Sequence, residues 1–402
     1  MSCKPRRILG LVLPAALLLL LAALCFLPRT ASAEEDDHPT AEELEAQLSD
    51  RVDSVIDGLD LDLFEEFLAS LEGSGGTSLK ETLRQLTESG GGDISGKLAE
   101  RAGDIFSEVL LGFLPGLVTV IAVCLLKGVL TGLTSGFERT GTANVVHIVC
   151  YSVIIAVLLA AATDVVVSVT STVSALAAFS EAVFPVLLTL LSAVGGAGSA
   201  AVYQPFMGVL SGGIVALISG VVLPAFVAAM IFSAVGGISD NVRLNKLAKL
   251  MRSGSTWLIG IVFGLYATFL TVQGVTGGVI DKLGFSAAKF AVSSYVPVLG
   301  GYLSDGFDLL TASLVLVKNA VGVTGAAALV AVVLMPLVKV ALFTLGLRLT
   351  AAVAEPVGDK KVSSAAGALA DNMSLLVTAL VGTAFMFFVL LLLIIGSCNP
   401  GV

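Results

Sequence analysis

The sequence predicts an all-α polytopic membrane protein with a cleaved signal peptide, an acidic extracytoplasmic helical segment and about six transmembrane helices. Apolar residues make up 56% of the 402 residues and charged residues only 13%, unlike the balance of a soluble domain. Several apolar runs approach the roughly 20 residues that a helix needs to cross the hydrocarbon layer. Apolar arms also recur in a similar pattern along the chain, which predicts three parallel approximate repeats.

A membrane hairpin at 221–274 determines the predicted orientation. Its first apolar arm begins VVLPAFVAAMIFSAVGG, and its second arm reads TWLIGIVFGLYATFLTVQG. The segment between the arms has no acidic residue after Asp240 and carries four basic residues: Arg243, Lys246, Lys249 and Arg252. Because short basic loops stay on the cytoplasmic side, this loop is predicted to face the cytoplasm.

A proline marks the first arm of each predicted repeat. The markers are Pro115, Pro224 and Pro336, which are 109 and 112 residues apart. A leader segment precedes the second and third markers, with a proline 39 residues before each, at Pro185 and Pro297. These spacings predict membrane repeats at 106–170, 171–282 and 283–402. Simple duplication produces such repeats without any transport path, so they indicate architecture more than function.

The first 33 residues have the features of a secretory signal. A basic start (4–7) precedes an apolar region (8–27), and Ala-Ser-Ala at 31–33 provides the small residues of a cleavage site. Cleavage would place Glu34 at the start of the mature chain, outside the cytoplasm. The alternative is an uncleaved anchor, because the apolar run is long for a signal.

The segment predicted at 34–105 is acidic and helical. Residues 34–104 contain 20 acidic and five basic side chains. Thr40 and Glu43 form a capping box, and apolar residues at helical spacing follow over 44–59. A second amphipathic helix begins near Asp62. The segment is either a docking surface for partner proteins or an acidic spacer.

The first predicted membrane pair covers 109–133 and 145–169. Lys127 and Arg348 stand twelve residues after Pro115 and Pro336. An ionisable residue in a membrane helix is a functional candidate because its burial is costly; the alternative, which we favour, is that both side chains reach the cytoplasmic interface. The first arm also presents a helix-packing face of glycines four residues apart: Gly128, Gly132 and Gly136.

The two leaders, 170–203 and 286–310, are interrupted by Glu181 and by Pro185 and Pro297. Counting the first leader as a full crossing would place the basic loop outside. We therefore expect re-entrant or surface-lying hairpins. Non-helical backbone at membrane depth occurs only where protein or water covers it, so a re-entrant leader would line a pore. Amphipathic helices on the outer face are the alternative.

The remaining crossings are predicted at 206–235, in the second arm of the 221–274 hairpin, at 318–349 and at 375–395. Further glycine pairs at helix-packing spacing occur at Gly208 and Gly212, and at Gly260 and Gly264. Six crossings follow after signal removal.

Sequence motifs give little support for catalysis. Cys124, Cys150 and Cys398 have no metal-ligand spacing, and no phosphate loop, nucleophile elbow or HExxH motif is present. Asp164, Glu181 and Lys318 are candidates for an ion route, although nothing in the sequence pairs them. The sequence predicts no enzyme activity, cofactor, metal site or nucleic-acid partner.

Four passages carry a resemblance to a known family: AVYQPFMGVLSGGIV, NVRLNKLAKLMRSGSTWLIGIVFGLYATFLTVQGVTGG, AAKFAVSSYVPVLGGYLSDGFDLL and SLVLVKNAVGVTG. Together with the signal and the acidic segment, they resemble the stage III sporulation protein AE family of endospore-forming bacteria. The resemblance is strongest over 203–325. It identifies a family and transfers no individual functional residue.

The resemblance implies a subunit of a channel-like transenvelope complex in the mother-cell membrane that faces the forespore. Its implied partners are the other products of the same operon and a forespore-membrane protein, with a homo-oligomer also possible. Such a complex sustains the forespore and its late gene expression. Two other functions stay open: a self-contained permease for a small solute, and a membrane anchor that only recruits partners.

Overall fold

The structure is a computed structural model that describes residues 41–70, 79–80, 83–84, isolated positions between 107 and 122, 140–236, 244–295, 300–356 and 360–398. The predicted signal peptide lies outside these residues, as does nearly all of the predicted first crossing at 109–133. Side chains between 272 and 308 are also outside the description. Within the described residues the chain is helical and contains no strand.

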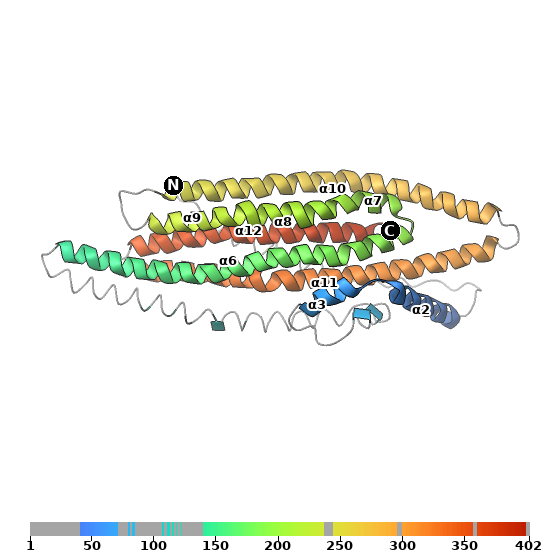
Figure 1. Ribbon diagram of the computed structural model, residues 1–402, viewed down its shortest axis with the longest axis horizontal. Coiled ribbons are helices and arrows are strands. Elements are labelled where there is room, and N and C mark those ends of the chain that lie inside the picture. The colour runs from blue at the N-terminus through green and yellow to red at the C-terminus, as the bar shows by residue number, and fades with distance from the viewer. Residues whose placement is uncertain are drawn as a thin grey trace.

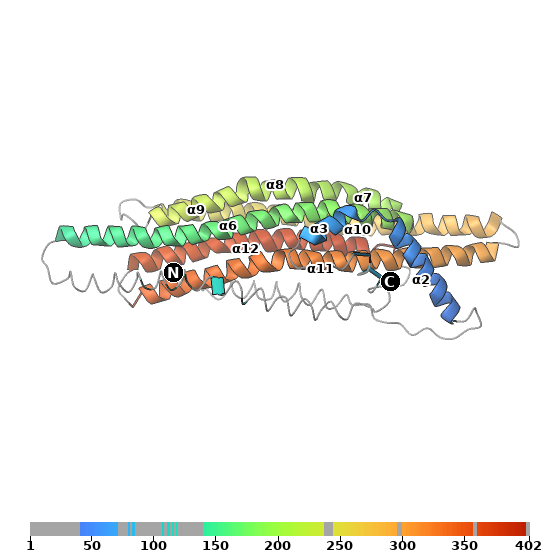
Figure 2. The ribbon, with the colours of Figure 1, turned by 60° about the horizontal axis from the view of Figure 1, so that its bottom comes forward.

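Five long stretches of helix form the described bundle: α6 (Thr140–Ala193), the stretch from α7 to α9 (Ala197–Val235), α10 (Asn245–Tyr295), α11 (Gly300–Ala354) and α12 (Lys360–Gly396). Each runs antiparallel to the stretch before it (Figures 1 and 2). We call the end with the connections 236–244 and 355–359 the loop end, and the end with the α6–α7 turn at 194–196 the turn end. All five stretches are long and apolar enough to cross a membrane. The predicted class, an all-α polytopic membrane protein, is confirmed.

The first leader is not a hairpin separate from the crossing helices. Residues 170–193 continue α6 without a break, and 197–203 begin α7. Pro185 lies inside α6, where it removes one backbone hydrogen bond. The helix persists because Phe184 and Leu187 beside the proline are fully buried in the bundle. The expected re-entrant or surface-lying form is therefore wrong for this leader.

The second leader is likewise shared between two long helices. Its described residues, 286–295 and 300–310, are the end of α10 and the start of α11. Pro297 falls between these helices, outside the described residues. At the turn end, α10 and α11 extend past the end of α12 (Figure 1). Both leaders thus belong to the turn end of one continuous bundle.

The stretch from α7 to α9 is irregular, unlike the other long helices. It contains α7 (Ala197–Gly208), the π-helix η1 (Val209–Ile214), α8 (Val215–Leu217), the π-helix η2 (Ile218–Val222) and α9 (Leu223–Val235). Pro224, which has no N–H to donate, stands in the first turn of α9 directly after η2. Pro336 lies instead inside the regular helix α11. The proline markers therefore occupy different local structures, and the repeats stay a prediction.

The acidic segment packs against the bundle through two described amphipathic helices, α2 (Ala41–Gly58) and α3 (Asp62–Ser70). Helix α2 contacts α11, and α3 contacts α6. Ile56 and Phe64 are fully buried, and the ring of Phe67 lies 5.8 Å from that of Phe179 on α6. The apolar stripe of this segment is thus covered by the chain itself, which leaves its charged face outward.

Helix α12 forms the centre of the bundle. Of the residues in its most apolar window, 61% are buried, against 22% for α10. It packs most extensively on α11 and also contacts α6, α9 and α10. The ring of Phe387 stacks on Phe184 at 6.2 Å and meets Phe179 edge-on at 6.4 Å. The core is therefore a helix surrounded by other helices of the same chain.

Candidate functional site

Polar side chains gather near both ends of α12, and these two groups are the strongest candidates for a site. We call them the turn-end tie, formed by Lys318, Ser397 and Tyr203, and the loop-end tie, formed by Arg252, Asp371, Asn372 and Ser233. Each joins α12 to neighbouring helices.

The turn-end tie holds the C-terminus of α12. Lys318 of α11 is completely buried, and its ammonium donates to the backbone carbonyl oxygen of Ser397. The Ser397 hydroxyl is 3.2 Å from that of Tyr203 on α7 and donates to the carbonyl of Leu393 at 2.6 Å. The last carbonyls of a helix have no helical partner and carry the negative end of its dipole. A buried cation at this position therefore satisfies and stabilises the helix end.

The α6–α7 turn packs directly against this helix end. Gly195 adopts φ 99°, and the N–H groups of Gly195 and Gly196 donate to the carbonyls of Ser192 and Leu191 at 3.1 and 2.9 Å. This is a Schellman motif, in which glycine at the left-handed position ends the helix. A Cβ on Gly196 would lie 2.8 Å from the sulfur of Cys398. Glycine at both positions thus lets the turn close on α12.

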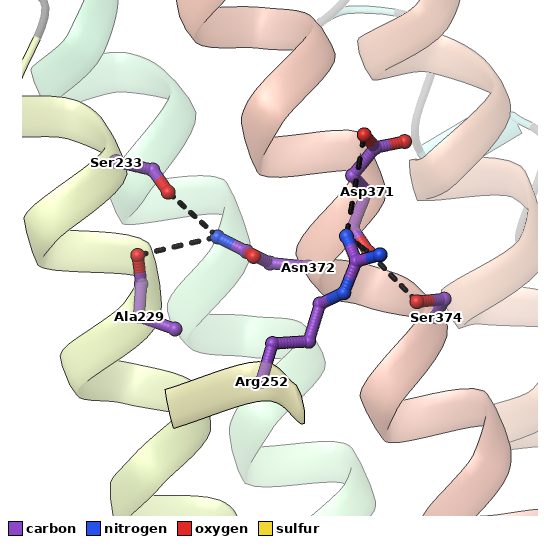
Figure 3. A network of polar contacts seen from close by, with 6 residues as sticks. All are labelled: Ala229, Ser233, Arg252, Asp371, Asn372 and Ser374. Atoms are coloured by element: carbon purple, nitrogen blue, oxygen red, sulfur yellow. Dashed lines mark hydrogen bonds and ion pairs between the residues drawn. The ribbon is translucent and has the colours of Figure 1, made fainter. Parts of the chain in front are cut away.

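The loop-end tie joins α12 to α9 and α10. The Asn372 amide donates to the hydroxyl of Ser233 at 2.9 Å and to the carbonyl of Ala229 at 3.2 Å. On the other side, Arg252 donates to the Asp371 carbonyl at 3.0 Å, and its guanidinium lies 4.0 Å from the Asp371 carboxylate. Figure 3 shows Asn372 of α12 pointing toward Ala229 and Ser233 of α9, and Arg252 of α10 reaching Asp371 of α12. The tie therefore connects three helices near the basic loop.

Two buried tyrosines make further cross-links. The Tyr151 hydroxyl of α6 donates to the Ala234 carbonyl of α9 at 2.8 Å, and that of Tyr266 on α10 donates to the Met386 carbonyl of α12 at 2.9 Å. A buried phenol needs such a partner because an unpaired polar group is costly. These bonds fix which levels of neighbouring helices lie side by side.

An apolar groove opens between α10 and α12. Its volume is about 190 Å³, and it is lined by Phe263, Tyr266, Ala267, Leu270, Thr271, Phe385, Val389 and Leu393. No charged side chain lines it. The groove suits an apolar group and offers no chemistry for catalysis.

The structure brings the ion-route candidates to separate places. Asp164 and Glu181 are both exposed on α6, about 25 Å apart along the helix, whereas Lys318 is buried. Pro185 is exposed one turn after Glu181. Lys127, Pro297 and Arg243 lie outside the described residues. No ion route joins the described candidates.

The described glycines that were predicted to pack helices together make no close contact with another described helix. A Cβ on Gly208, Gly212, Gly260 or Gly264 would meet nothing within 4 Å. Among the described glycines, close packing within the chain occurs instead at Gly196, Gly322 and Gly325. Contact of the open glycines with another chain stays a prediction. Gly128, Gly132 and Gly136 lie outside the described residues.

Of the predicted basic loop, Lys246 and Lys249 are exposed, and Arg252 belongs to the loop-end tie. The polar partners in both ties were not predicted from the sequence. The one available signal was weak: Asn372 is an amide three residues before the crossing predicted at 375–395, and an amide in a membrane helix can form an interhelical hydrogen bond. Ser397 and Tyr203 carry no comparable signal.

The bundle and its two ties define a class: a multi-pass helical membrane protein in which several buried polar side chains join neighbouring helices. Sequence comparison then identifies the family. The model of the stage III sporulation protein AE family matches residues 77–398, and the chain belongs to this family.

A curated relative agrees with this assignment. The chain is 28% identical over 375 residues to the stage III sporulation protein AE of Bacillus subtilis (strain 168), and the match covers 92% of each chain. No solved structure shows a significant match.

Proposed function

We propose that this protein is a non-enzymatic integral subunit of a transenvelope channel that links mother cell and forespore during sporulation. The observation that carries the proposal is the match along 92% of both this chain and its Bacillus subtilis relative, together with the family match over 77–398, which includes helices α6 to α12. The role is maintenance of the forespore and of its late gene expression.

The polar groups of the bundle support a structural role. Lys318 and Asn372 are both buried, and each donates hydrogen bonds to groups from other helices or helix ends of the chain. A permease that moves a polar solute needs such groups turned toward a path. Two ties that hold α12 in place are what a rigid subunit of a larger assembly requires.

The proposed location is the mother-cell membrane that faces the forespore. With the basic loop in the cytoplasm, α2, α3 and the turn end with both leaders lie in the space between the two membranes. There they meet the other operon products and a forespore-membrane partner. The open glycines Gly208, Gly212, Gly260 and Gly264 are then available for contact with another subunit.

The proposed domain organisation follows the sequence prediction. A cleaved signal (1–33) and the acidic segment (34–105) precede three membrane repeats at 106–170, 171–282 and 283–402.

Deletion of the gene in its own spore-forming organism tests the role. We expect small, collapsing forespores and a silent late forespore reporter after engulfment, with rescue by the wild-type gene. Normal spores with an active reporter would contradict the proposed function.

Substitution of a charged residue distinguishes the two candidate functions, channel subunit and permease. Glu181→Gln removes an exposed carboxylate that makes no described contact with either tie. A channel subunit tolerates this change and still assembles with its partners. Loss of solute transport with normal assembly would favour the permease.

A further inference from the structure

The helices of the bundle are much longer than a bilayer is thick. Helices α6 and α11 have 54 and 55 residues, which is about 80 Å each at 1.5 Å per residue. The hydrocarbon layer is about 30 Å thick. Lipid therefore covers less than half of each helix.

We propose that the hydrocarbon layer surrounds only the loop-end half of the bundle, up to the level of Phe179, and that the turn-end half projects from the membrane into water. The proposal assigns a lipid-facing surface and an aqueous surface to helices that are apolar along most of their length. It does not rest on the proposed function.

Exposed acidic residues indicate where the hydrocarbon layer ends on the turn-end side. Helix α3 carries Asp62, Glu65 and Glu66 and packs through Phe67 against Phe179. Two residues further along α6, Glu181 is exposed. Carboxylates at the surface of a bundle are costly in hydrocarbon. The level of Phe179 therefore lies at the edge of the hydrocarbon or beyond it.

Contacts of Phe179, and of residues that contact it, identify the residues of the other helices that lie at the same height along the bundle. A Cβ on Gly325 of α11 would be 3.9 Å from the Phe179 ring, and the Phe387 ring of α12 is 6.4 Å from it. Met386, next to Phe387, accepts the hydrogen bond of Tyr266 on α10. Gly325, Phe387 and Tyr266 thus mark the same edge on three helices.

Basic residues mark the other edge at the expected distance. Lys246 precedes Tyr266 by 20 residues, and Arg348 follows Gly325 by 23, which is about 30 and 35 Å of helix. Both basic residues lie close to the loop end, where long side chains extend into the interface. The layer between the two levels has about the thickness of hydrocarbon. The exposed carboxylates Asp164 and Asp371 lie about 22 and 24 Å from the Phe179 level, so they fall in the part of this layer nearest the loop end.

The exposed side chains of α6 change in character near Thr170, nine residues before Phe179. On α6, exposed large apolar residues end at Val167, and the exposed positions after Thr170 are small, polar or acidic: Ser171, Ser174, Ala178, Glu181, Pro185, Thr189, Ser192 and Ala193. On the described part of α10, Leu250, Trp257, Ile261 and Leu265 are exposed on the loop-end side of Tyr266, and Phe269 is exposed about one turn beyond it. On the described part of α11 (309–354), Leu310 and Leu316 are exposed on the turn-end side of Gly325, and Met335, Leu345 and Leu349 are exposed on the loop-end side.

This placement has consequences for the sites. Helix α11 starts at Gly300, 25 residues beyond Gly325, so it projects about 37 Å from the membrane edge. The turn-end tie and Pro185 then lie outside the hydrocarbon. On α6, the membrane crossing moves from the predicted 145–169 toward Glu181.

Cysteine labelling of the full-length chain in membranes tests the placement. The five native cysteines are replaced by serine, and single cysteines are introduced as Leu310→Cys and Met335→Cys. These positions lie on the same helix and are 40% and 42% exposed, so protein packing shields them equally. Thr189→Cys and Val167→Cys form a second pair on α6. A membrane-impermeant maleimide is offered to both faces of opened vesicles, and labelling in denaturing detergent gives the total.

We expect Leu310→Cys and Thr189→Cys to react at least roughly tenfold faster than Met335→Cys and Val167→Cys, because the reaction needs the thiolate, which requires water. Denaturation should make all four equal. Equal rates within each pair before denaturation would overturn the proposal. If Leu310→Cys does not accumulate, Leu316→Cys takes its place.

Discussion

Basic residues hold both ends of α12, but in different surroundings. At the turn end, Lys318 is completely buried and donates to the Ser397 carbonyl. At the loop end, the Arg252 side chain is 32% exposed and shares the Asp371 carbonyl with the Ser374 hydroxyl. The first cation has no water to replace its protein partner, whereas the second has. The two ties should therefore contribute very different free energies of unfolding.

The closeness of helix packing also differs between the two ends of α12. A Cβ on Gly322 of α11 would collide with Ile395 near the turn end of α12, whereas one on Gly367 near the loop end would meet nothing within 4 Å. The turn end of α12 thus makes a close contact beside a buried charge, whereas its loop-end half has buried apolar side chains such as Leu369 and Met373 but leaves open space at Gly367.

The largest effect is expected for Gly322→Val, which inserts atoms into the side chain of Ile395. Overpacking of this kind typically costs about 1–3 kcal/mol of unfolding free energy and occasionally more, and a Cβ that overlaps the Ile395 side chain places this case at the upper end or above it. The thermal midpoint of the purified protein in detergent should fall, and the second substitution Ile395→Ala should recover part of the loss. Gly367→Val is the matched control and should leave the midpoint unchanged or raise it, since valine has the higher helix propensity. Equal losses for both would contradict the packing difference.

A second effect is expected for Lys318→Met, which keeps the apolar stem and removes the ammonium. The Ser397 carbonyl loses a charged donor, and such hydrogen bonds contribute about 1.5–3 kcal/mol. We expect a lower thermal midpoint and faster proteolysis after α12. Lys339→Met, at a half-buried position on the same helix, is the control and should change little. An unchanged midpoint in Lys318→Met would show that the buried charge does not stabilise the helix end.

Asn372→Leu should have a smaller effect than Lys318→Met. It removes the amide that bonds Ser233 and Ala229, but leucine fills a similar volume in an apolar core. Interhelical hydrogen bonds in membrane proteins contribute about 0.6 kcal/mol on average. The midpoint should fall slightly, and Ser233→Ala in the Asn372→Leu background should add nothing. A loss as large as that of Lys318→Met would remove the distinction between the two ends.

Much of the fold follows from the sequence, because apolar runs near bilayer length and basic loops are strong one-dimensional signals. They predicted the apolar core of all five described helical stretches, but these helices extend well beyond the predicted bounds, and Lys246, Lys249 and Arg252 of the predicted basic loop lie inside α10. The prediction for the first leader was wrong because Pro185 was treated as a break in the helix. The burial of Phe184 and Leu187 outweighs the one hydrogen bond that the proline removes. Local sequence does not reveal such tertiary compensation.

The candidate sites were less predictable. Lys318 was selected as an ionisable residue in an apolar helix, but its partner is the backbone of Ser397, and a backbone carbonyl has no sequence signature. Glycine spacing selected Gly260 and Gly264, where an added Cβ would meet nothing within 4 Å among the described residues, and missed Gly322 and Gly325, where it would meet side chains of other helices. Spacing identifies a smooth helix face, and only the packed structure shows which face another helix covers.

The smallest effect is expected for Arg252→Gln, and it tests the comparison most directly. Partly exposed ion pairs contribute about 0–1 kcal/mol because water competes for both partners. We expect little change in the thermal midpoint, and a double-mutant cycle with Asp371→Asn should give a coupling below about 0.5 kcal/mol. A coupling as large as the whole effect of Lys318→Met would mean that exposure does not decide the strength of these ties. The weak tie would then hold α12 as firmly as the buried one, and the loop end would be as rigid as the turn end.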